Sequence, residues 1–60
     1  MEHKLNVHDA DNGKRVTITV EEGPTPYSVT LTFGSSYSIT LSADDASDLA
    51  TALAKVADFG

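Results

Sequence analysis

A run of acidic and amide side chains near the N-terminus is the first candidate for metal chemistry. Positions 9–13 read DADNG, which is similar to the start of a calcium-binding loop. Such a loop has glycine at its sixth position and an acidic residue at its twelfth, whereas Lys14 and Val20 stand there. Asn-Gly is also a strong short-hairpin signal, because both residues tolerate positive φ. We therefore interpret the segment as a hairpin turn.

Histidine, serine and aspartate are the other residue types that could do chemistry. His3 and His8 differ in parity along an extended segment, so they point to opposite faces and cannot share a metal within one chain. The sequence has no cysteine, no G-x-S-x-G nucleophile motif and no glycine-rich phosphate loop. Asp44 and Asp45 are adjacent on a predicted helix, so their carboxylates splay apart. We expect no catalytic residue, no cofactor and no metal, and hence no enzyme.

Alternating apolar residues predict two N-terminal strands. Lys4–His8 and Arg15–Glu21 both alternate, and the second is rich in β-branched residues. With the turn between them, residues 3–21 form a predicted hairpin. Two prolines in positions 22–26 cannot donate to a sheet ladder, so the chain leaves the sheet there.

Two further strands follow, and they have one apolar and one hydroxyl face. Tyr27–Phe33 places Tyr27, Val29, Leu31 and Phe33 on one side, and Tyr37–Leu41 repeats the pattern after a short turn at positions 34–36. The alternate positions carry serine and threonine, which suit an exposed strand face.

The C-terminal segment predicts a helix over Ala43–Val56. Ser42 begins a capping-box pattern, and the aspartates that follow suit the positive end of the helix dipole. Alanine and leucine recur at three- and four-residue steps and form one apolar face. The prediction is a single α+β domain over residues 1–60, a four-stranded antiparallel β-meander followed by one C-terminal α-helix packed on its apolar face.

This architecture predicts an incompletely covered sheet. Four strands make a sheet roughly 15–19 Å wide, and a helix about 10 Å across covers two or three of them. A chain of 60 residues without disulfides is marginal alone, and exposed apolar patches usually mark interfaces. We expect a homodimer or a host protein partner. The candidate interface residues are Leu5, Val7, Val16, Tyr27, Phe33, Ala46, Ala50 and Ala54. The alanine ridge packs either on its own sheet, which we favour, or on a partner helix.

Charge and hydropathy argue against nucleic-acid-binding, membrane and secreted proteins. Nine acidic and four basic side chains give a formal net charge of −5, and direct nucleic-acid binding needs a basic patch. Lacking an apolar run of ~20 residues and an apolar signal core, the chain is expected to be cytoplasmic, with no membrane contact.

One alternative function is an acidic inhibitor of a basic nucleic-acid-binding protein, and another is a ligand-binding sheet surface. The acidic surface comprises Glu21, Glu22, Asp44, Asp45 and Asp48.

Three segments together resemble a known family. VTITV at positions 16–20, YSITLS at 37–42, and Ala46, Leu49 and Leu53 are similar to the N-terminal oligomerisation domain of the mycobacterial H-NS-like nucleoid silencer. The resemblance covers roughly residues 16–56 and implies a dimerising domain, with DNA binding in a separate C-terminal domain. This sequence departs from the pattern in its extra strand at Lys4–His8 and in lacking a basic Arg-Gly-Arg-type tail, so we expect no DNA binding. The resemblance implies a small non-enzymatic oligomerisation domain of phage or actinobacterial origin that regulates a host silencer.

Overall fold

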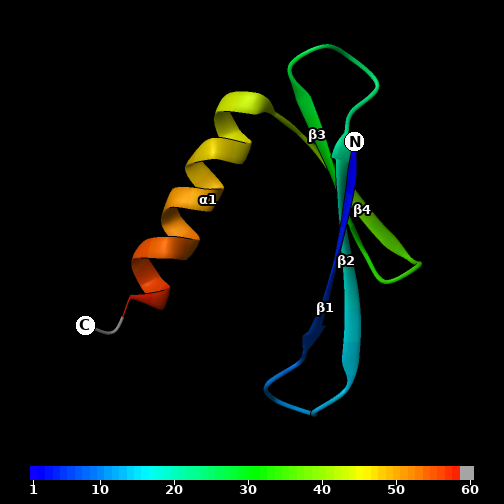
Figure 1. Cartoon of the computed structure of the whole chain (residues 1–60), viewed down its shortest axis with the longest axis vertical. Coiled ribbons are helices and arrows are strands. Elements are labelled where there is room, and N and C mark those ends of the chain that lie inside the picture. Colours follow the sequence, from blue (N-terminus) through cyan, green and yellow to red (C-terminus); the bar gives the residue numbers. More distant parts are fainter. Residues whose placement is uncertain (59–60) are drawn as a thin grey trace.

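A computed structural model describes residues 1–58 and confirms the predicted α+β architecture (Figure 1). Its elements are β1 (Glu2–His8), β2 (Arg15–Glu22), β3 (Ser28–Phe33), β4 (Tyr37–Ser42) and α1 (Ala43–Ala57). The strands form one antiparallel sheet in the order β1-β2-β3-β4, so neighbours in the chain are neighbours in the sheet. Each boundary lies within two residues of the prediction.

The strand register places apolar residues together on one face. Leu5 lies opposite Ile18, and Ile18 lies opposite Phe33 in the next strand. Because successive side chains point to opposite faces, this register aligns the apolar positions of all four strands. One face of the sheet is therefore apolar from β1 to β4.

Hydroxyl, amide and charged groups occupy the other face, and some of the hydroxyl and amide groups bond to each other across the strands. The Thr30 and Thr40 hydroxyls lie 3.0 Å apart, and the Thr17 hydroxyl donates to Asn6 Oδ1 at 3.0 Å. Such cross-strand pairs stabilise neighbouring strands.

The turn between β1 and β2 is a hairpin connection, as predicted, but a longer one than Asn-Gly alone suggests. The Asp9 N–H donates to the Lys14 carbonyl at 2.8 Å, which closes the loop. Asp9 Oδ1 accepts from the Asp11 N–H, and Asn12 Oδ1 accepts from the Lys14 N–H. These side-chain oxygens replace backbone turn partners, so only Gly13 needs a positive φ, of 73°.

The prediction that Tyr27 belongs to the third strand is wrong. β3 begins at Ser28, and Tyr27 has a φ of 64° and is 87% exposed. Its carbonyl accepts a hydrogen bond from the Ala43 N–H at 2.7 Å. Tyr27 therefore takes the left-handed conformation where the chain re-enters the sheet, and its backbone contacts the start of the helix.

Ser42 joins the sheet to the helix without a loop. It is the last residue of β4 and the N-cap of α1, and its hydroxyl accepts from the Asp45 N–H at 3.1 Å. Asp44 and Asp45 lie in the first turn and Lys55 in the last, which suits the helix dipole. Because the helix starts at the next residue, its direction is set at this junction, and it slants away from the sheet (Figure 1).

The chain is open for its size. Its radius of gyration is 12.7 Å, against about 10.4 Å for a compact domain of this length. α1 contacts β4 and β3 but neither β1 nor β2. No residue in the described part of the chain is fully buried, so the fold lacks a closed core.

The cap at Ser42 should stabilise the junction measurably. We expect Ser42→Ala to lower the free energy of unfolding by about 1 kcal/mol, because one helical N–H loses its acceptor. Ser42→Thr keeps a hydroxyl acceptor, so it should lower the free energy of unfolding by less than about half as much as Ser42→Ala. Urea unfolding followed by circular dichroism measures both, and equal losses in the two variants would contradict the capping role.

Candidate interaction surface

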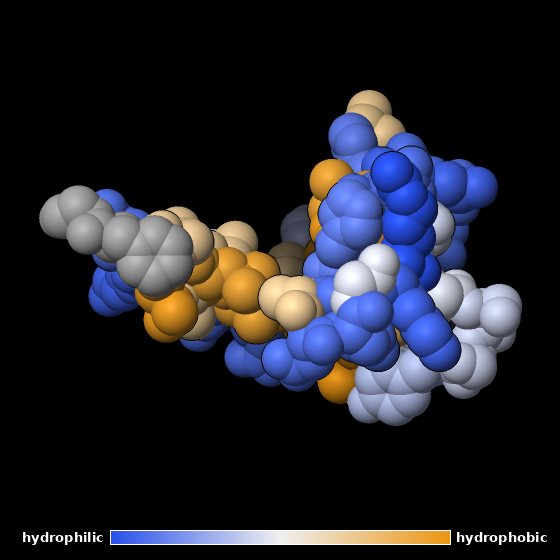
Figure 2. Space-filling view, turned by 90° about the horizontal axis from the view of Figure 1, so that it is seen from below, coloured by the Kyte–Doolittle hydropathy of each residue, from blue (hydrophilic) through white to orange (hydrophobic). Residues whose placement is uncertain are grey.

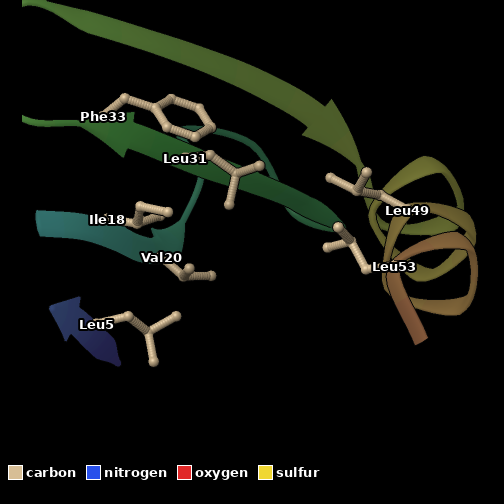
Figure 3. Close-up of a pocket in the computed structure, with 7 residues that line it drawn as sticks. All are labelled: Leu5, Ile18, Val20, Leu31, Phe33, Leu49 and Leu53. Carbon is tan, nitrogen blue, oxygen red and sulfur yellow. The ribbon is translucent and has the colours of Figure 1, made fainter. Parts of the chain in front are cut away.

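An apolar hollow lies between the sheet and the helix. Its volume is about 300 Å³. Figure 3 shows Leu49 and Leu53 extending from α1 toward the sheet, with the strand residues spaced across from them. The residues that line it are Leu5, Ile18, Val20, Leu31, Phe33, Leu49 and Leu53.

Two different periodicities bring these residues to one space. On the strands, steps of two place Ile18 with Val20 and Leu31 with Phe33 on the same face. On the helix, a step of four places Leu49 above Leu53 on one side. The sheet face and the helix face are thus directed toward the same hollow from opposite sides.

The hollow is open and its walls carry large exposed side chains. Leu5 is 53% exposed and Leu53 is 63% exposed. Val56, one turn further along α1 and outside the lining of the hollow, is 78% exposed. Figure 2 shows apolar surface along the helix, which projects from the mainly hydrophilic body of the sheet. An apolar space offers water no hydrogen-bond partners, so these walls favour an apolar occupant.

The structure brings together only some of the predicted interface residues. Leu5 and Phe33 line the hollow, while Val7 and Val16 lie opposite each other further along the same face. Tyr27 lies outside the strands, as described above.

The alanine ridge of α1 is only partly covered by its own sheet. Ala46 is half-buried, but Ala50 and Ala54 are exposed. The helix packs on β4 and β3 of its own chain, and the alternative that the ridge meets a partner helix stays a prediction. The helix tilts away from the sheet beyond its first turns, because the junction at Ser42 fixes its direction.

The candidate interface residues named from the sequence did not include Ile18, Val20, Leu31, Leu49 or Leu53. Their alternation and helical spacing correctly gave the face on which each lies. Whether that face is covered depends on the angle between β4 and α1, which no local pattern encodes. The missing loop after Ser42 is the one signal that could have indicated an open angle.

Four of the five predicted acidic-surface residues, all but Asp48, lie at one end of the sheet. Glu22 pairs with Val29, and Ser28 pairs with Ser42, so β2 ends where α1 begins. Glu21 and Glu22 therefore lie at the same end as the first turn, with Asp44 and Asp45. The N-terminal amine lies 3.3 Å from Glu22 Oε1, in a contact too exposed to stabilise the fold much.

The two histidines lie on opposite faces, as predicted. His3 pairs with Val20 on the apolar face, whereas His8 pairs with Arg15 on the other. Within residues 1–58, no three side chains of the types that bind metals form a group able to hold an ion. No helix in that range is both long and apolar enough to cross a membrane.

Comparisons with protein-family models, with curated proteins and with solved structures gave no match. The resemblance to the silencer's oligomerisation domain therefore stays a prediction.

The open hollow should bind a neutral apolar dye whose fluorescence rises in apolar surroundings. We expect the double variant Leu5→Gln/Leu53→Gln to reduce the fluorescence gain several-fold, because it makes two walls polar. The matched variant Lys4→Gln/Thr51→Gln changes β1 and α1 at positions that do not line the hollow and should leave the gain unchanged. Equal losses in both variants would contradict a localised hollow.

Proposed function

We propose that the protein is a small, non-enzymatic protein-interaction domain that self-associates through its apolar hollow, as an accessory or regulatory module. The observation that carries this is the hollow itself, lined by seven apolar side chains in a chain whose described residues include no buried one. A folded domain needs buried apolar surface to offset its conformational entropy. A second chain can bury the apolar side chains that one chain leaves exposed.

Surface area supports the same proposal quantitatively. The chain exposes 4948 Å², whereas a compact monomer of 6.3 kDa exposes about 3,700 Å². The excess is about 1,200 Å² per chain, more than the roughly 800 Å² that each partner buries in a standard interface. Covering the excess on two chains corresponds to an obligate dimer rather than to a transient contact.

Homodimerisation is the simplest form of this proposal. Two-fold dimers are the commonest closed assemblies, and they bury the same patch on both copies. The resemblance to a dimerising domain supports the same assignment.

A charge placed in the hollow should break the association. We expect Leu5→Asp to raise the dimer dissociation constant at least tenfold, because the interface would bury an unpaired carboxylate. Leu5 is half exposed in one chain, so the substitution removes little burial within that chain, and helical circular dichroism should fall only where the dimer dissociates. Sedimentation velocity over a dilution series measures the constant, and circular dichroism checks the fold.

Asn6→Asp is the matched control. It adds the same charge to the neighbouring residue of β1, on the opposite face, and it keeps an acceptor for the Thr17 hydroxyl. We expect Asn6→Asp to change the dimer dissociation constant less than twofold. If both variants weaken association equally, net charge rather than the hollow controls it.

The acidic end of the molecule favours a second candidate, an acidic inhibitor of a basic protein. Its carboxylates come from β2 and from the first turn of α1. This candidate binds through exposed charges, whereas the hollow binds through apolar contact.

Salt separates the two candidates. Each chain carries a net charge of −5, so two copies repel each other and salt screens that repulsion. We expect self-association to strengthen a few-fold when ionic strength rises from about 0.05 M to about 0.5 M. Binding of a basic probe such as polylysine should weaken over the same range. Self-association that collapses in salt would contradict an apolar interface.

A further inference from the structure

We infer that the occupant of the hollow is α1 of a second copy, lying across β1 and β2, beside the copy's own helix. Two helices would then lie side by side between two sheets. Each sheet would be covered by its own helix and by the helix of the second copy. This arrangement depends on the proposed self-association and specifies which surfaces meet.

The position of α1 in its own chain leaves half of the apolar face bare. β4 is an edge strand, and α1 follows it directly at Ser42. The helix therefore contacts β4 and β3 only. Leu5 on β1, with Ile18 and Val20 on β2, faces the hollow from the uncovered half.

The width of the sheet leaves space for one more helix. Four strands span roughly 15 Å between the outer backbones, and side-by-side helices lie about 8–10 Å apart. With the chain's own helix at β3 and β4, one further helix fits over β1 and β2. A single additional helix thus completes the layer.

A second copy presents a helix with the required surface. Leu53 and Val56 of α1 are 63% and 78% exposed and lie within one turn of each other. A two-fold axis that places one helix over a partner's β1 and β2 places the partner's helix over the equivalent strands in return. The same two-fold rotation then covers the uncovered half of each sheet face and the exposed side of each helix. This burial accounts for the excess surface on each chain.

Disulfide cross-linking tests this arrangement, because the chain has no cysteine of its own. The double variant Leu5→Cys/Leu53→Cys is oxidised in dilute solution and run on a non-reducing denaturing gel. A disulfide needs its two Cα atoms within about 7 Å, and β1 lies three strands away from the β4 edge that holds α1. We expect most of the protein to become a covalent dimer, with peptide mass mapping showing a link from position 5 of one chain to position 53 of the other.

A second measurement uses single substitutions. A chain carrying only Leu5→Cys, mixed with a chain carrying only Leu53→Cys, should give the same 5–53 linked peptide. The matched variant Asn6→Cys/Leu53→Cys places the strand cysteine on the opposite face and should give at least tenfold less of the corresponding link. Circular dichroism confirms that each variant is folded.

The outcomes separate this inference from the proposed function. A native dimer that gives an intramolecular 5–53 disulfide, or no 5–53 link, overturns the placement of the partner helix and leaves self-association standing. A native mass of one chain at all concentrations overturns both. Equal cross-linking of the position 5 and position 6 variants also overturns the placement, because it shows no preference for the apolar face.

Discussion

The direct passage from strand to helix at Ser42 is the constraint on which the rest of the structure depends. One residue ends β4 and caps α1, and the Ala43 N–H bonds to the Tyr27 carbonyl, so the first turn is held against the start of β3. With no loop to turn it back, the helix leaves the sheet at the angle that the junction sets. The hollow, the exposed leucines and the uncovered strands all follow from that angle.

The open arrangement leaves a short chain with little buried apolar surface to stabilise its fold. Sixty residues without cysteine have neither a disulfide nor a large core to offset the entropy of folding. The chain nevertheless has a regular sheet register, a capped helix and cross-strand hydrogen bonds. Local structure is thus well specified, while most of the apolar burial is not completed within one chain. Association completes it in our account, and folding and assembly become linked through protomer concentration.

The sequence was informative wherever the determinant is local. Alternation identified all four strands, the Ser42 pattern identified the start of the helix, and opposite parity placed His3 and His8 on different faces. Tyr27 was misplaced because alternation continues through it, while the backbone turns left-handed after two prolines. The hollow was only partly predictable, because the sheet–helix angle comes from the junction as a whole rather than from any residue type. The apolar face of the helix was predicted, but not that Leu49 and Leu53 on it would line an open hollow.

Self-association through the hollow is best tested by the native mass of the unmodified chain, measured by light scattering on a sizing column over a hundredfold range of concentration. We expect a species of twice 6.3 kDa over most of the range, with loss of helical circular dichroism when dilution separates the chains. A well-folded species of 6.3 kDa at every concentration would contradict it, because the open hollow would then be stable without a second copy.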